Sequence, residues 1–247
     1  MAKLSVKGLD KHFDGLAAIE KLDLDLEDGI ITALVGPNGA GKTTLFNLIT
    51  GNLIPDGGRV DFEGRSILGL PPYRVARLGI ARSFQDLRLF NHMTVRENVA
   101  TVPEQLAWLW QAGGANARRV RQESETLALQ RTGLAQHAQS RAVDLSYAER
   151  KFLSLARIMA SGAQIWLLDE PASGLDPASR SRFTEVLKKA AAEGTTICLI
   201  EHNLDIVTEL ADRIVFLDRG RKLADGSPTE ILRNPELAEV YFGRRRA

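Results

Sequence analysis

The 247-residue sequence has little net charge, a single cysteine and no long apolar run. Its 32 basic and 31 acidic residues give a net charge of +1, so no overall field attracts nucleic acid or anionic lipid. Cys198 alone cannot form an internal disulfide, which favours a reducing compartment. No apolar run approaches the roughly 18 to 20 residues that a membrane span needs, and no signal peptide opens the chain. We therefore expect any membrane process that the chain serves to depend on a separate polypeptide.

Residues 36–43 read Gly-Pro-Asn-Gly-Ala-Gly-Lys-Thr and match G-x-x-x-x-G-K-[ST], the phosphate-binding loop. The apolar run 31–35 before the loop predicts a buried strand, and residues 44–49 after it predict a helix that stops at Gly51. In this context the backbone N–H groups turn inward around a triphosphate, Lys42 reaches the outer phosphates, and the Thr43 hydroxyl is placed for Mg²⁺. The sequence thus predicts that the nucleotide is bound by Gly36, Pro37, Asn38, Gly39, Ala40, Gly41, Lys42, Thr43 and Thr44.

The order of the remaining segments predicts an α/β fold with a helical insertion. Strands are expected in an early group, 3–9, 22–26, 31–35 and 59–62, and in a later group, 165–169, 196–200 and 214–218. Residues 91–163, between the groups, are rich in Ala, Leu, Arg, Gln and Glu and show no convincing strand. We expect a nucleotide-binding core in 1–90 and 164–247, interrupted by a helical segment at 91–163.

Several short signals mark element ends. Thr94 and Glu97 form a capping box that begins a helix, and Ser227-Pro-Thr-Glu230 combines an N-cap, a first-turn proline and a reciprocal glutamate. Arg219-Gly220 separates two short strand patterns as a hairpin turn would.

A pair of carboxylates follows the apolar strand 165–169. Ligands of parallel sheets bind at the carboxyl ends of the strands, where Asp169 and Glu170 emerge. Asp169 can hold Mg²⁺, and Glu170 can orient or deprotonate a water aimed at the γ-phosphate. An Asp-Glu pair is also common at strand ends without any such role, and the phosphate loop decides in favour of the catalytic interpretation.

A third feature is the run Leu145-Ser-Tyr-Ala-Glu149, where Ser146 and Glu149 form a second capping box. Helix capping alone is a complete reason for both residues. The order of the motifs along the chain is evidence for a further role. The motifs occur in this order: the phosphate loop, Gln85, this capped helix, Asp169-Glu170, Ser173-Gly174-Leu175-Asp176 and His202. In this order they resemble the ATP-binding-cassette (ABC) ATPases over almost the whole chain.

The resemblance implies a P-loop NTPase of the ABC ATPase type, with a RecA-like core, an antiparallel β subdomain and an inserted helical subdomain. It also implies a head-to-tail dimer that buries two ATP molecules, in which Ser146, Tyr147, Ala148 and Glu149 face the ATP of the partner subunit. Phe13 would stack on adenine, Gln85 would sense Mg²⁺ and the membrane partner, and His202 would contact the γ-phosphate. Asp176 would link the two sites. On their own, Phe13 would more often be a core residue and His202 a hydrogen-bonded polar residue.

The signature has Leu145-Ser-Tyr-Ala-Glu149 where the family pattern is Leu-Ser-Gly-Gly-Gln. Tyrosine at the third position resembles relatives that import branched-chain amino acids, whereas Ala148 at the fourth position does not. A glycine there lets backbone come close to phosphate, whereas a Cβ would force a looser approach or a strained backbone. We expect slower hydrolysis at the site built with this signature. A non-catalytic, nucleotide-gated subunit is the alternative that Ala148 motivates.

Further segments, 79–90, 93–98, 200–203, 211–214 and 234–243, are similar to the ATPase subunits of branched-chain amino-acid importers. This kinship implies a second ATPase subunit, identical or paralogous, a separate integral membrane permease and, indirectly, a solute-binding protein. It places the chain at the cytoplasmic face of the plasma membrane, with no nucleic-acid partner. The alternative is an ABC-type ATPase that serves another transport system or a soluble assembly of the cluster-scaffold or DNA-repair kind. Trp108 lies off the apolar face of its predicted helix, so it either packs against another helix of the insertion or contacts a permease helix.

Overall fold

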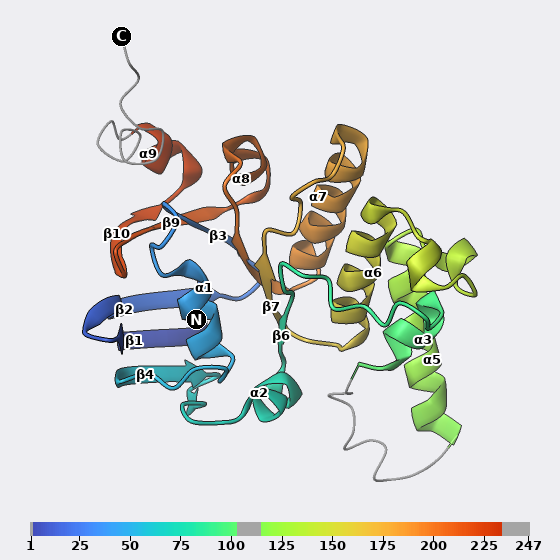
Figure 1. Cartoon of the computed structure of the whole chain (residues 1–247), viewed down its shortest axis with the longest axis horizontal. Helices are drawn as coiled ribbons and strands as arrows, with labels where there is room; N and C mark the ends of the chain where they lie inside the picture. Colours follow the sequence, from blue (N-terminus) through green and yellow to red (C-terminus); the bar gives the residue numbers. More distant parts are fainter. Residues whose placement is uncertain (1, 103–114, 234–247) are drawn as a thin grey trace.

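The structure, a computed structural model, describes residues 2–102 and 115–233. Trp108 and the segment 234–243 lie outside the described residues. In Figure 1 the strands β1, β2 and β4 lie at one side of the molecule and the helices α3, α5 and α6 at the other. No helix within the described ranges is long and apolar enough to cross a membrane.

The larger sheet has six strands in the order β10-β9-β3-β8-β7-β6. They are β3 (Ile31–Val35), β6 (Ile80–Arg82), β7 (Ile165–Asp169), β8 (Thr196–Ile200), β9 (Arg213–Asp218) and β10 (Arg221–Gly226). Only β10 pairs antiparallel, with β9, through the hairpin predicted at Arg219-Gly220. Every residue of β3, β7 and β8 is buried, which explains why these strands read as unbroken apolar runs.

The smaller sheet is antiparallel, with four strands in the order β2-β1-β4-β5. They are β1 (Ala2–Phe13), β2 (Leu16–Glu27), β4 (Gly57–Phe62) and β5 (Arg65–Ser66). Alternate residues such as Leu4, Val6 and Leu24 point into a core shared with α1 (Lys42–Ile49) and one face of the larger sheet. This burial holds α1, and with it the phosphate loop, between the two sheets.

The other face of the larger sheet is covered by helices (Figure 1). They are α6 (Tyr147–Ala160), α7 (Pro177–Ala192) and α8 (Leu204–Leu210), while α3 (Val95–Ala100) and α5 (Ala115–Arg131) pack against α6. Phe152 of α6 and Phe183 of α7 meet in this core with ring centroids 5.3 Å apart. The remaining short elements are α2 (Pro72–Leu78), α9 (Pro228–Arg233) and the 3-10 turns η1 (Ala135–His137) and η2 (Ala142–Asp144).

Local signals predicted several element ends. The capping box at Thr94 is present, and Glu230 accepts from the Ser227 N–H at 2.9 Å as predicted. Among the described residues of 91–163 the only β pairing is one isolated bridge, between Thr94 and Arg141. Strand β6 was not predicted, because only Ile80 of its three residues is buried and no alternation marks it. The boundaries at 91 and 163 as domain limits stay a prediction.

Candidate functional site

Chain segments far apart in sequence meet in one hollow at the carboxyl edge of the larger sheet. The phosphate loop connects β3 to α1, Gln85 follows β6, Asp169 ends β7, and His202 follows β8. The hollow is lined by Ala18, Asn38, Gly39, Ala40, Gly41, Lys42, Thr43, Thr44, Gln85, Asp169, Glu170, Ile200 and His202. The parallel sheet therefore brings residues 38–44 of the predicted nucleotide site and both carboxylates together, whereas Phe13, Gly36 and Pro37 do not line the hollow.

The glycines of the loop are required by close backbone contacts. Gly36 has a φ of 146°, and a Cβ on it would lie 2.0 Å from the Leu217 carbonyl oxygen. Gly41 has a φ of 102°, and a Cβ on it would lie 2.5 Å from the Ala18 carbonyl oxygen. Gly41 also begins α1 without any side-chain cap, so the first N–H groups of that helix have no side-chain acceptor from the cap residue. This arrangement fits an anionic ligand at the helix end.

Lys42 lies buried against the loop that precedes it. Its Nζ donates to the Gly36 carbonyl oxygen at 2.6 Å and to the Pro37 carbonyl oxygen at 2.8 Å. Burial lowers the pKa of Lys42, while the charges of Glu170 and Asp169 oppose that shift. An ammonium group has three N–H donors, so one remains for a phosphate oxygen.

Asp169 is held between Ser83 and Arg82, two residues that flank the end of β6. The Asp169 N–H donates to Ser83 Oγ at 2.9 Å, and Arg82 Nη2 lies 3.6 Å from Asp169 Oδ2. Burial raises the pKa of Asp169, and the Arg82 charge opposes this shift. The sequence interpretation missed Arg82; a basic residue beside a buried strand gave no signal until β6 was known to pair with β7.

Glu170 and His202 lie together above the loop, with His202 Nε2 2.9 Å from Glu170 Oε1. Glu170 has a φ of 46°, a left-handed conformation that is uncommon for a residue other than glycine. Its N–H donates to the Ile200 carbonyl oxygen at 3.0 Å, which fixes the turn to β8. A carboxylate in contact with an imidazole beside a phosphate loop is suited to orient or deprotonate a water.

These residues fit a nucleoside triphosphate with Mg²⁺. Within the described part of the chain no three His, Cys, Asp or Glu side chains form a metal cluster. Mg²⁺ is usually held by one or two protein oxygens together with substrate phosphates and water, and this hollow offers Thr43, Gln85 and Asp169 for that purpose.

The signature residues lie away from this hollow, at the first turn of α6. Ser146 Oγ accepts from the Glu149 N–H at 3.3 Å, and Glu149 Oε2 accepts from the Ser146 N–H at 2.8 Å. Glu149 also lies 3.2 Å from His137 Nε2. Tyr147 donates its hydroxyl to the Ser173 carbonyl oxygen at 3.3 Å. The signature residues 146–149 therefore do not line the phosphate-loop hollow of their own chain.

The structure also gives the local setting of three further predicted residues, Ala148, Phe13 and Asp176. Ala148 lies in the regular first turn of α6 and has no left-handed φ in the single chain, and its effect on the approach to phosphate stays a prediction. Phe13 is 44% exposed at the end of β1, with Lys11 Nζ 5.5 Å from its ring centroid, so it is not a core residue. Asp176 caps α7 by accepting from the Ala178 and Ser179 N–H groups, both at 3.0 Å.

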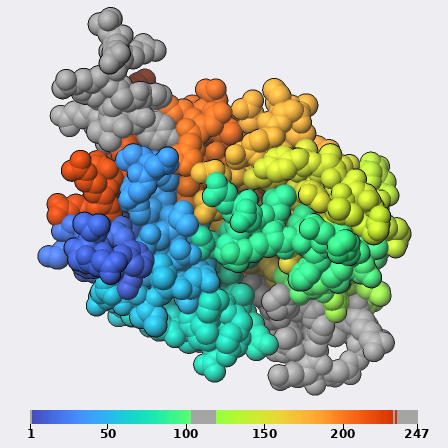
Figure 2. All heavy atoms as spheres, viewed as in Figure 1, coloured from blue at the N-terminus to red at the C-terminus, as the bar shows by residue number. Residues whose placement is uncertain are grey.

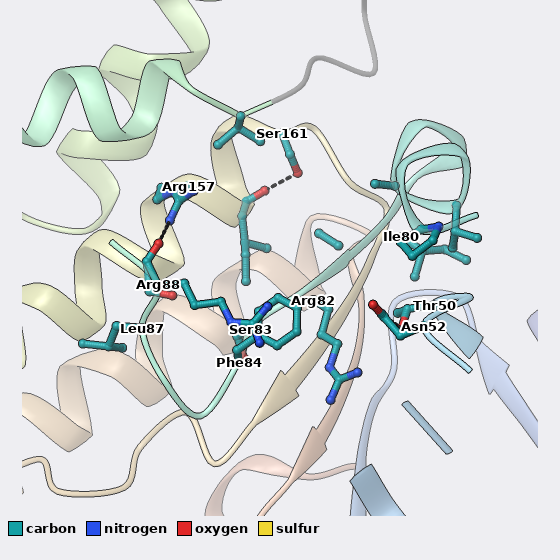
Figure 3. A pocket seen from close by; sticks show the side chains of 17 residues that line it. Thr50, Asn52, Ile80, Arg82, Ser83, Phe84, Leu87, Arg88, Arg157 and Ser161 are labelled. Carbon is teal, nitrogen blue, oxygen red and sulfur yellow. Dashed lines mark hydrogen bonds between the residues drawn. The ribbon is translucent and has the colours of Figure 1, made fainter. Parts of the chain in front are cut away.

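A second hollow lies between the larger sheet and α6 (Figure 3). We call it the arginine groove, because Arg82, Arg88 and Arg157 line it beside apolar residues that include Phe84 and Leu87. Arg157 Nη1 donates to the Arg88 carbonyl oxygen at 2.8 Å. The Nε atoms of Arg82 and Arg157 are buried and have no hydrogen-bond partner among the described residues. In Figure 2 the green segment after β6 runs over the surface between the blue early part of the chain and the yellow helices.

The parallel sheet, the phosphate loop and the paired carboxylates define a P-loop nucleotide-binding protein. The model of the ABC transporter family matches residues 19–173. The chain belongs to this family and is an ABC-type ATPase, the ATP-binding subunit of a transporter.

Two relatives match this chain over nearly its full length. The chain is 39% identical over 248 residues to the high-affinity branched-chain amino acid transport ATP-binding protein LivG of Salmonella typhimurium, covering 97% of each chain. It is 37% identical to BraF of Pseudomonas aeruginosa, again over 97% of each chain. Among solved structures, the ADP conformation of MJ1267, an ATP-binding cassette of an ABC transporter, is 28% identical with a TM-score of 0.86, covering 99% of this chain and 100% of that one.

Proposed function

We propose that this chain hydrolyses ATP to power the uptake of branched-chain or other hydrophobic amino acids through a separate permease. The observation that carries the proposal is the 39% identity to LivG over 97% of the chain. The hollow supports the ATPase half of the proposal, because it joins a phosphate loop to Asp169, Glu170 and His202. The proposed location is the cytoplasmic face of the plasma membrane.

The polar groups of the hollow have proposed roles. The loop N–H groups and Lys42 would hold the phosphates, and Thr43, Gln85 and Asp169 would hold Mg²⁺, which would neutralise phosphate charge. Glu170 orients or deprotonates the attacking water, and His202 fixes the Glu170 carboxylate and contacts the γ-phosphate. Exposed Phe13 stacks on the adenine ring.

The signature residues are proposed to complete the ATP site of a second ATPase subunit in a head-to-tail dimer. The support is their placement: Ser146 to Glu149 lie outside their own hollow, at the N-terminus of a 14-residue helix. A helix N-terminus with a hydroxyl group favours a terminal phosphate. The turn from Ser173 to Asp176 would lie beside the same interface, and the partner is identical or paralogous.

The arginine groove is the proposed contact for the permease. Its occupant would be a permease helix with apolar side chains and a carboxylate, because the groove offers apolar walls and two guanidinium groups whose buried Nε atoms have no hydrogen-bond partner in the described part of the chain. Residues 91–163 would then move against the core as one subdomain and carry closure of the ATP dimer to the permease. A solute-binding protein would act through the permease.

Purification of the complex from its native membrane tests the proposal. We expect a permease and a second ATPase subunit to co-purify and the reconstituted complex to take up leucine, isoleucine or valine only with ATP. A complex without a membrane protein would instead favour a soluble assembly. A membrane complex that transports a different class of solute would contradict the amino-acid assignment alone.

A further inference from the structure

Lys151 is a buried lysine to which the proposed reaction assigns no role. It lies on α6, one helical turn after Tyr147, and its residue surface is only 6% exposed. Its Nζ donates to the Glu170 carbonyl oxygen at 3.0 Å. A long charged side chain seldom lies buried without a partner that holds it there. The contact therefore ties the signature helix to the main chain of the proposed catalytic carboxylate.

The segment that Lys151 contacts is conformationally strained. Glu170 has a φ of 46°, although it precedes Pro171, and a residue before proline favours an extended backbone. Such a conformation persists only where the surroundings fix it. Here the Glu170 N–H donates to the Ile200 carbonyl oxygen at 3.0 Å, and the Ala172 N–H donates to Glu201 Oε1 at 3.2 Å. Lys151 supplies the third contact, on the Glu170 carbonyl oxygen.

Charge balance keeps Lys151 in this place. Burial lowers its pKa, and the carboxylates of Glu201, Glu170 and Asp169 act in the opposite direction. Glu201 is itself 3% exposed, and burial raises its pKa while Lys151 lowers it. The two buried residues thus offset part of each other's desolvation while both bind the main chain of the same turn.

We infer that Lys151 is a positioning residue: by holding the Glu170 carbonyl oxygen it fixes the turn that aims the Glu170 carboxylate, and it does so from the helix that begins at Ser146. Tyr147 makes a second link from the same helix, through its hydroxyl to the Ser173 carbonyl oxygen. This link is close, since a Cβ on Gly174 would lie 2.9 Å from Tyr147 Cε1. The inference rests on the proposed function of Glu170.

The consequence is a mechanical connection inside one subunit. When the first turn of α6 contacts the ATP of the partner, any displacement of the helix reaches Glu170 through Lys151 and the turn at 173–174 through Tyr147. The signature that binds one ATP would therefore adjust the carboxylate that serves the other ATP of the dimer.

Steady-state ATP hydrolysis by the assembled complex tests the inference, with Lys151→Met or Lys151→Arg introduced into this chain. A catalytic group misplaced by about 1 Å can cost on the order of 10²-fold, so we expect kcat of Lys151→Met to fall by about that factor. The KM for ATP should stay unchanged, because no phosphate-binding residue is altered. Arginine can still donate to the Glu170 carbonyl oxygen, so Lys151→Arg should recover most of the loss. The matched control is Lys188→Met, at a lysine of α7 with a 46% exposed side chain, which should leave kcat unchanged.

The outcomes separate this inference from the proposed function. A natural chain and Lys151→Met with equal kcat would overturn the inference and leave the ATPase assignment intact. A natural complex that does not hydrolyse ATP would overturn both. If Lys151→Met fails to fold because the buried Glu201 carboxylate loses the opposing charge of Lys151, the double variant Lys151→Met with Glu201→Gln removes both buried charges. An equal loss of nucleotide binding and kcat in a folded variant, without recovery in Lys151→Arg, would show a purely structural role and overturn the inference.

Discussion

His202 Nε2 lies 2.9 Å from Glu170 Oε1, so the residues that follow β8 and β7 meet directly beside the phosphate loop. This contact gives the Glu170 carboxylate a fixed direction in a hollow that also contains Lys42. We therefore propose separate roles for the two parts of the site: the loop binds phosphate, and Glu170 orients or deprotonates the attacking water.

Glu170→Gln separates these two tasks. The amide keeps the size of the side chain but cannot accept a proton, so hydrolysis should fall by about 10²- to 10⁴-fold, the usual contribution of a general base. The dissociation constant for MgATP should stay close to that of the natural chain. Equilibrium binding and single-turnover hydrolysis on the same preparation measure both quantities, and near-normal turnover would refute the role of Glu170.

Gly41→Ala should abolish ATP binding, because its Cβ would lie 2.5 Å from the Ala18 carbonyl oxygen and 2.8 Å from Ile19 Cδ1. The control is Gly64→Ala, where φ is also positive, at 76°, but nothing lies within 4 Å of the added Cβ. A left-handed conformation costs alanine about 1–2 kcal/mol, so the control should lose about that much unfolding free energy and keep its affinity for ATP. Equal affinities in the two variants would contradict the close-approach argument.

Ala148→Gly tests the signature. The backbone at Ala148 is regular helix, so the remaining reason for slow hydrolysis is a Cβ that keeps the helix end away from phosphate. We expect the glycine variant in the assembled complex to hydrolyse ATP faster. Ala160→Gly, at the other end of the same helix, controls for the lower helix propensity of glycine. Equal rates of hydrolysis in the natural complex and in the Ala148→Gly complex would contradict the hypothesis that the Ala148 Cβ slows hydrolysis.

Cys198 should not react with thiol reagents in the folded chain. It is fully buried, and burial raises the pKa of its thiol from 9.0 to about 12. The thiolate is the reactive form, so at mildly alkaline pH the folded protein should show no free thiol until denaturant is added. Because the unfolded chain loses this proton at lower pH than the folded chain, Cys198 lowers stability as pH rises above 9.0. Rapid modification of the native protein would contradict the burial of β8.

Local sequence patterns predicted the features that depend on neighbours in the chain. The loop at 36–43, the buried strands β7 and β8 and the caps at Ser146 and Ser227 all follow from residues within one element. Arg82 beside Asp169 did not, because that pairing depends on β6 joining β7 at the edge of the sheet.

The contacts of Lys151 and Glu201 were hidden for the same reason. One lies on α6 and the other follows β8, 50 residues later by their numbers, and both reach the turn after β7 only in the folded chain. In sequence, Lys151 is one polar residue of an amphipathic helix, and Glu201 is the neighbour of His202. Only the tertiary fold brings Lys151 and Glu201 to the same turn, residues 170–172.

The structure of Glu170→Gln with MgATP, solved as a dimer, tests the central claim most directly. The account predicts each ATP between residues 36–43 of one subunit and the helix end at Ser146 of the other, with Asp169 at the metal. ATP contacted by one chain alone, or bound away from residues 36–43, would contradict it.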